Sequence, residues 1–261
     1  MSVHWIKQQT ISSFVHDDRK TRLLRRMTIA KQSDQGLTLI EGLIAIVIIA
    51  ITVVSITPPI FWAVASRVQT QRAEQALKLA QGEIDRVRTL VDRGETTSLD
   101  LLPPEVAAAT NVRSSVAAPN SAGTGVISAR GDCASATFPP TSSATFVGVD
   151  TNADCNPDYF LQTFRSQGLD QLGNPFTRGA NQTLSGFVMG VRVYSVVARS
   201  ELDAGRGDTQ AASLQGTNGL GNQRNRPLAV LYSTIVRSND SQNLELYRRL
   251  CPATTTTTGA C

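Results

Sequence analysis

Histidine is almost absent from this sequence of 261 residues, and its two copies, His4 and His16, both lie near the N-terminus. Residues 37–261 therefore contain no histidine for a Ser-His-Asp triad or for a histidine-based metal site. No glycine-rich phosphate-binding loop stands out either. We expect a protein that is not an enzyme and needs no cofactor, although one loop described below resembles a calcium site.

Glycine, proline and charge are also limited. The 19 glycines and 11 prolines are too few for a collagen-like chain. A hydrophobic fraction of 41% with 18% charged residues excludes a wholly disordered one. Positive charge is in excess only in residues 1–36, where seven basic and three acidic side chains give +4. Residues 37–261 sum to zero, so the body gives no indication of nucleic-acid binding.

A long uncharged stretch follows the basic N-terminal segment. Between Glu41 and Arg67 lie 25 residues without a charged side chain. A bilayer core of roughly 30 Å is crossed by about 20 helical residues, so the stretch predicts a transmembrane helix over residues 37–59. By the positive-inside rule the basic segment stays in the cytoplasm. This predicts a single-pass protein of the inner (cytoplasmic) membrane whose C-terminal domain is extracytoplasmic.

One charged side chain, Glu41, lies within the apolar stretch itself. A carboxylate there costs roughly 2.5–3.5 kcal/mol on insertion scales and indicates a function. In a plain signal anchor, Glu41 would simply lie at the membrane interface. A cleaved secretory signal is a further alternative, because Ala63-Val64-Ala65 precedes Ser66 as a small-x-small site. The apolar stretch is longer than such signals usually have, and its helical pattern continues through the proposed cut.

The residues around Glu41 favour a third interpretation. Gly36-Leu37-Thr38-Leu39-Ile40-Glu41 stands between a basic leader and an apolar helix. This arrangement resembles the prepilin cleavage and methylation motif of type IV pilins and type II secretion pseudopilins. Pro58 falls at the twenty-second position after Gly36, where many such pilins also carry proline. Leu37 replaces the commoner Phe and the leader is long, which favours a minor pilin or pseudopilin.

The resemblance implies a set of roles and partners. A prepilin peptidase would cut between Gly36 and Leu37, and the new α-amine of Leu37 would be N-methylated. Glu41 would then pair with the Leu37 amine of a neighbouring subunit and set the axial register of the filament. The implied partners are other pilins or pseudopilins and the assembly platform of a type IV pilus or type II secretion system.

A narrower resemblance involves Arg67–Arg72, Val191–Tyr194 and Pro227–Val230, which look like stretches of the pseudopilins of cyanobacterial hormogonium polysaccharide secretion. It implies a filament that supports polysaccharide secretion and gliding motility. The alternative function is a membrane-anchored extracytoplasmic binding or adhesion protein, which would need no cut at Gly36. Two RGD triplets, at 130–132 and 206–208, are typical of flexible turns in loops of this composition.

The sequence predicts an α+β, pilin-like fold in which a long N-terminal helix packs on a small antiparallel sheet. Residues 1–36 form the cytoplasmic leader, and an amphipathic helix over 60–93 follows the transmembrane part, with Pro58 and Pro59 expected to kink or locally melt it. Residues 94–261 form the extracytoplasmic β-rich domain. Its expected strands are Thr145–Val149, Tyr159–Arg165, Phe187–Arg199 and Leu228–Arg237, with a further strand or turn unplaced within 94–145.

All four cysteines follow residue 130, on the side that the predicted topology places outside, where disulfides form. Of the three pairings, spacing favours Cys133–Cys155 and Cys251–Cys261, the second closing a small C-terminal loop as in many pilins. Free thiols are the alternative.

Oxygen-bearing side chains recur between the second and third expected strands, and calcium binds such oxygens. The spacing resembles an EF-hand loop but has Cys155 where glycine is wanted and Leu161 where glutamate is wanted. A polar turn is therefore the favoured alternative. The candidate calcium ligands are Asp150, Asn152, Asp154 and Asp158.

The processing prediction is tested by mass spectrometry of the membrane fraction. We expect an N-methylated Leu37 terminus, and a bulky change at the cleavage site, Gly36→Glu, should leave the leader attached. An intact Met1 terminus, or a chain that starts at Ser66, would contradict the prepilin interpretation.

Overall fold

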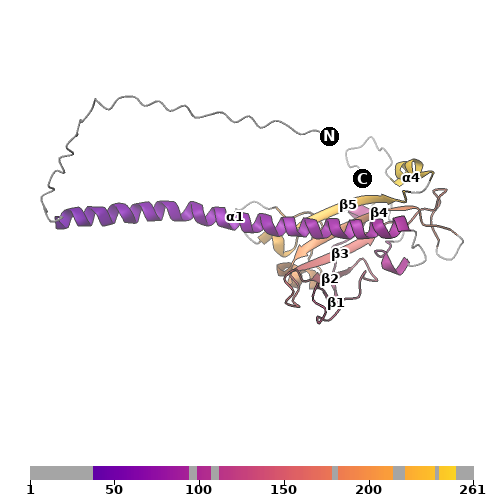
Figure 1. Cartoon of the computed structure of the whole chain (residues 1–261), viewed down its shortest axis with the longest axis horizontal. Coiled ribbons are helices and arrows are strands. Elements are labelled where there is room, and N and C mark those ends of the chain that lie inside the picture. Colours follow the sequence, from indigo (N-terminus) through magenta and orange to yellow (C-terminus); the bar gives the residue numbers. More distant parts are fainter. Residues whose placement is uncertain are drawn as a thin grey trace, which may run out of the picture. The chain divides into compact units, whose positions relative to one another are not determined.

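The computed structural model describes residues 38–93, 99–106, 112–177, 182–213, 221–238 and 241–250. The chain forms two compact units, residues 1–55 and 56–261. In the described residues the first unit consists of the beginning of helix α1 (Leu39–Arg93), and the second holds the rest of that helix and a β-sheet (Figure 1).

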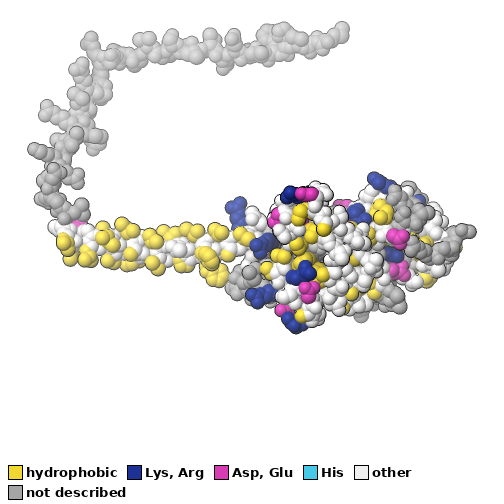
Figure 2. Space-filling model, turned by 90° about the horizontal axis from the view of Figure 1, so that it is seen from below, with side chains coloured by type: hydrophobic (Ala, Val, Ile, Leu, Met, Phe, Trp, Pro, Cys, Tyr) yellow, Lys and Arg dark blue, Asp and Glu magenta, His cyan; other side chains and the backbone are white. Residues whose placement is uncertain are grey.

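Helix α1 spans 55 residues and confirms the expected long helix. Its first part is long and apolar enough to cross a membrane, and none of the most apolar window is buried. Figure 2 shows hydrophobic side chains along the visible face of this part. Helix α1 ends at Arg93, the end expected for the amphipathic helix over 60–93.

The predicted melting of the helix at its two prolines is wrong. Pro58 and Pro59 lie inside α1, which continues through both positions. Neither proline can donate to the carbonyls of Val54 and Ser55, so two backbone hydrogen bonds are lost. The flanking turns keep the helix together, and in an apolar solvent a melted segment would leave still more polar groups unpaired. A kink at this point stays a prediction.

The sheet has five strands in the order β1-β2-β3-β4-β5 (Figure 1). Strands β2 to β5 pair antiparallel with their neighbours, whereas β1 pairs parallel with β2. The α+β class is therefore confirmed. The strand bounds are β1 Ser121–Ile127, β2 Thr145–Val149, β3 Tyr159–Arg165, β4 Gly186–Ser195 and β5 Ala229–Val236.

Strands β2 and β3 have the predicted bounds, but the prediction for β4 extended too far. Strand β4 ends at Ser195, which lies opposite Tyr159, the first residue of β3. Among the described residues no partner strand extends the ladder beyond Ser195, and the chain turns into a 3-10 helix (Val196–Ala198) and helix α3 (Arg199–Asp203). The end of a neighbouring strand thus overrides the β-propensity of Val196 and Val197.

Strand β1 is the strand that the sequence analysis left unplaced within residues 94–145. It lies at the edge of the sheet, its residues are largely exposed, and it contains Gly123 and Gly125, which lower strand propensity. At Gly125 the backbone has a positive φ of 73°, and an added Cβ would lie within 3 Å of the Ser135 backbone. Glycine is required there by both conformation and space.

The main core lies between α1 and one face of the sheet. Helix residues at spacings of three to four turn inward and join side chains of β3, β4 and β5 in one cluster. Burial begins well inside the expected amphipathic segment 60–93, because Val68 is exposed and the first buried residue is Ala76. Alanines at this end let the backbone approach the sheet closely. The buried helix residues are Ala76, Ala80, Glu83, Ile84, Val87 and Val91.

Two polar contacts hold α1 in place, one with strand β3 and one with the short segment that follows the helix. At one end of the contact the Tyr159 hydroxyl lies 2.7 Å from the Gln75 side-chain oxygen. Farther along, Arg86 forms two 2.8 Å hydrogen bonds with the buried Glu83 carboxylate and donates to the Leu101 carbonyl at 3.1 Å. Burial raises the pKa of Glu83 above its usual value, and Arg86 limits the rise.

The opposite face of the sheet is also covered, so all ten residues of β4 are buried. Arg192 lies fully buried in this second layer. Its guanidinium donates to the carbonyls of Val116 and Ala117 at 3.0 and 3.1 Å, lies 3.1 Å from the Tyr232 hydroxyl, and stacks over the Phe164 ring. These contacts hold the segment after helix α2 (Val112–Ser115) against the sheet.

The core between α1 and the sheet predicts the effect of truncating Phe187, which is fully buried there. Phe187→Ala should lower the free energy of unfolding by about 3–5 kcal/mol, because it leaves a cavity. Denaturant titration of the purified chain in detergent, followed by near-ultraviolet circular dichroism, measures the change. Leu77→Ala, on the outer side of α1, is the control and should cost far less. Equal losses would contradict this core assignment.

Candidate functional site: the first turn of the long helix

The first turn of α1 is organised by Thr38. The backbone N–H of Glu41 donates to the Thr38 carbonyl at 2.9 Å and lies 3.4 Å from its hydroxyl oxygen. The N–H of Gly42 donates to the same carbonyl at 3.1 Å. Thr38 therefore acts as the N-cap, and Glu41 stands at the third helical position, where an acidic residue is favoured.

The Glu41 side chain is exposed in an otherwise apolar surface. Leu39 and Ile40 before it are exposed, and the exposed apolar residues continue through the first unit. A carboxylate in the first turn is close to the positive end of the helix dipole, which partly compensates its charge. Full compensation in hydrocarbon still requires a cationic partner. Gly36 and Leu37 lie outside the described residues.

Residues 31–57 match the family described as the prokaryotic N-terminal methylation motif. The chain carries the prepilin signature of type IV pilins and pseudopilins. This signature implies processing by prepilin peptidase and assembly with other pilins in a membrane machinery. Gly36, Leu37 and Glu41 all lie within the matched segment. Comparisons with curated proteins and with solved structures find no match.

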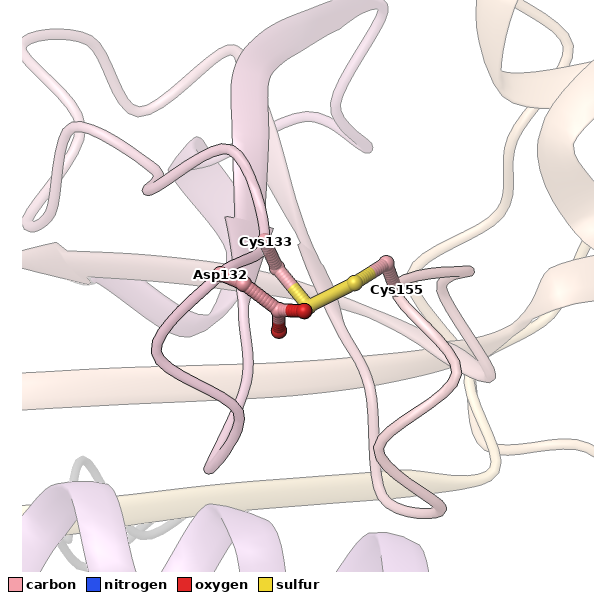
Figure 3. A group of neighbouring side chains, drawn as sticks. All are labelled: Asp132, Cys133 and Cys155. Atoms are coloured by element: carbon pink, nitrogen blue, oxygen red, sulfur yellow. A yellow bond between two sulfur atoms is a disulfide. The ribbon is translucent and has the colours of Figure 1, made fainter.

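The predicted disulfide between Cys133 and Cys155 is present, with the two Cα atoms 5.3 Å apart (Figure 3). It joins the connection between β1 and β2 to the loop between β2 and β3. Asp132 lies beside it, but both sulfurs are bonded to each other and offer no thiolate to a metal. Cys251 and Cys261 lie outside the described residues, and their pairing stays a prediction.

The predicted calcium ligands form a different kind of structure. The two carboxylate oxygens of Asp150 accept hydrogen bonds from the backbone N–H groups of Asn152, Ala153 and Cys155 and from the Ser128 hydroxyl, at 2.8–3.0 Å. One carboxylate oxygen of Asp158 likewise accepts from the backbone N–H and the hydroxyl of Thr151. The side chains of Asn152 and Asp154 accept from the backbone of the loop in the same way.

These contacts favour a polar turn over a calcium site. A cation needs several oxygens that converge on one point, and here the candidate oxygens accept hydrogen bonds from donors of their own loop. Calcium binding stays a prediction. Ala153 and Cys155 have positive φ values of 63° and 67°, which are unfavourable for residues other than glycine. The Asp150 hydrogen bonds and the disulfide hold this conformation together.

The same hydrogen bonds shift the titration of Asp150. Burial alone would raise its pKa, but the hydrogen bonds from Ser128, Cys155, Asn152 and Ala153 together outweigh burial and lower the pKa below the usual 3.8. The charged form is therefore favoured in the folded protein. Its stabilising effect is present above pH 3.8 and is lost as the pH falls through the lower, folded-state pKa.

We predict that Asp150→Asn destabilises the outer domain at neutral pH, because an amide has one acceptor oxygen and cannot accept all four hydrogen bonds. The difference in melting temperature from the original protein should shrink as the pH falls below 3.8. Thermal melts across this pH range measure it. Asp203→Asn, which removes a partner of exposed Arg199, should show no comparable pH dependence.

The same melts also test calcium. Because the loop's own donors occupy the Asp150 oxygens, adding calcium should leave the melting temperature unchanged relative to chelator. A rise with calcium that Asp150→Asn abolishes would contradict the polar-turn interpretation and support metal binding.

Proposed function

We propose that this protein is a minor pilin or pseudopilin, a structural subunit and not an enzyme. It assembles through α1 into a type IV pilus-like or secretion pseudopilus filament. The observation that carries the proposal is the position of Glu41, a carboxylate in the first helical turn of an exposed apolar helix, inside the matched methylation motif. In a plain membrane anchor Glu41 would only favour the start of the helix at the membrane surface, and its carboxylate would need no cationic partner.

In the proposed filament the charge of Glu41 finds its partner on another subunit. Cleavage after Gly36 creates an α-amine on Leu37, four residues before Glu41. The Leu37 amine of a neighbouring subunit, offset along the filament axis, then reaches the Glu41 carboxylate. Leaving one member of a buried pair alone costs about 3–5 kcal/mol, so only one stagger of neighbouring subunits satisfies both groups.

The rest of the apolar helix supplies the packing. Large side chains from Leu39 to Val64 are exposed, and in water such a surface would be strongly unfavourable. In the membrane lipid covers it, and in the filament neighbouring helices cover it. The sheet domain needs no change between the two states, because its own core is closed by the second half of α1.

We further propose that the filament supports polysaccharide secretion and gliding motility, with the outer domain on the extracytoplasmic side of the inner membrane. The support is the resemblance of three sequence stretches to pseudopilins of polysaccharide secretion. Two of these stretches meet in the sheet, where Arg192 pairs with Val230 and Val193 with Ala229. Their positions in β4 and β5 connect this resemblance mainly to the fold of the outer domain.

The adhesion alternative gains no support from the RGD triplets. In the first triplet Arg130 binds Asp132 itself at 2.6 Å. In the second, Arg206 pairs with Glu201 at 2.7 Å and Asp208 with Arg226 at 2.9 Å. The charged groups that a receptor would have to recognise are engaged within the domain.

Glu41→Ala tests the assembly role. The variant should still insert into the membrane, because its helix becomes more apolar. Its incorporation into filaments should fall by roughly tenfold or more, since each 1.4 kcal/mol lost is a factor of ten. Quantitative immunoblots of sheared filament and membrane fractions measure both quantities. Glu74→Ala, an exposed glutamate later on α1, is the matched control and should assemble normally. Normal incorporation of Glu41→Ala would contradict the register role.

A further inference from the structure

Two adjacent aromatic residues, Phe61 and Trp62, lie near the end of the charge-free stretch of α1. Their side chains are 72% and 55% exposed, and the first charged residue, Arg67, follows five residues after Trp62. Neither aromatic belongs to the core clusters of the described residues. These side chains are large and apolar, and no core contact among the described residues explains why they are there.

The two rings do not lie on one side of the helix. Consecutive helical residues point about 100° apart, so Phe61 and Trp62 face different directions. Ile60 and Val64 add exposed apolar surface on other sides of the same turn. Burial of α1 against the sheet begins only at Ala76. At the level of Phe61 the helix is therefore apolar around its circumference, which suits a surrounding solvent better than a single partner groove.

The spacing along the helix fits the thickness of a bilayer. Phe61 follows Glu41 by 20 residues, which corresponds to about 30 Å of helix at 1.5 Å per residue. The hydrocarbon core of a bilayer has about the same thickness. When Glu41 lies at the cytoplasmic surface, Phe61 and Trp62 lie at the opposite one. Arg67, which is exposed, then falls where lipid phosphates can bind it.

We propose that Phe61, Trp62 and Arg67 form an anchor that binds the phospholipid headgroup region at the outer surface of the membrane and fixes the depth of α1. The indole N–H of Trp62 has no hydrogen-bond partner among the described residues, and interfacial water and lipid carbonyls supply one. Phe61 fills the acyl boundary. Arg67 complements the phosphate charge and stops the helix from sinking farther.

The anchor gives Glu41 a defined depth before any filament exists. It holds the preceding cleavage site, Gly36, at the cytoplasmic surface. The proposal concerns the single chain in lipid and does not depend on assembly, so its test separates it from the proposed function.

The sequence provides its own probe, because the chain has two tryptophans and the other, Trp5, lies in the leader. The full chain with Trp5→Phe is reconstituted into vesicles of phosphatidylcholine and phosphatidylglycerol that carry bromine at shallow or deep acyl positions. Fluorescence of Trp62 should be quenched most by the shallow bromines and weakly by aqueous iodide. Diluting the protein with excess lipid should leave this pattern unchanged.

Three variants calibrate the measurement, all in the Trp5→Phe background. Val54→Trp combined with Trp62→Phe moves the probe eight residues back along α1, and deep bromines should then quench best. Arg67→Leu, with the Trp5→Phe background, extends the apolar stretch and should shift Trp62 toward the deeper quenchers. Lys78→Leu, an exposed charge beyond the stretch, should not.

Three outcomes would overturn the proposal. Strong iodide quenching of Trp62 would place it in water, and strongest quenching by deep bromines would place it in the hydrocarbon. Quenching that weakens as protein concentration rises would show that the ring contacts another copy of the chain instead of lipid.

Discussion

Helix α1 has to fit two environments, an apolar one along its first part and the face of a sheet along its second part. The rest of the structure follows from that constraint. From Leu43 to about Val64 the exposed surface of α1 carries no charge and is largely apolar, and from Ala76 only one stripe is buried. The first pattern suits lipid or neighbouring helices, and the second needs a sheet. The methylation motif and the sheet domain are therefore joined by a helix whose surface changes over three turns.

The sheet covers the buried stripe of α1 with one face, and its other face is covered as well. Strand β4 lies between β3 and β5 and contributes to the α1 core on one side and to the layer around Arg192 on the other. The buried guanidinium of Arg192 donates to main-chain carbonyls and so holds the segment after α2 on the sheet. It does this without a carboxylate partner. This arrangement lets a domain with long non-helical connections keep a closed core.

Local sequence patterns predicted the parts that depend on local physics. The motif around Glu41 and the bounds of β2 and β3 could be located, because hydrophobic spacing and charge are read along the chain. Strand β1 could not be located from the sequence, since its pairing depends on another strand. One of its glycines, Gly125, is needed for a close contact with the Ser135 backbone. The burial of Arg192 was equally hidden, because strand alternation does not reveal that both faces are covered. The sequence of the Asp150 loop has the oxygen-bearing side chains that calcium binds. Only the fold reveals that backbone N–H groups of the same loop donate to these oxygens.

The disulfide between Cys133 and Cys155 makes the stability of the sheet edge depend on the redox state of its surroundings. It closes 22 residues of separation around β2, and such a ring removes about 3 kcal/mol of chain entropy from the unfolded state. Disulfides persist in oxidising compartments and are rare in the cytosol. The link between the edge of the sheet and the loop after β2 is therefore stable only in oxidising surroundings. A reducing compartment would remove that link, and the positive-φ conformation of Ala153 and Cys155 would then depend on the Asp150 hydrogen bonds alone.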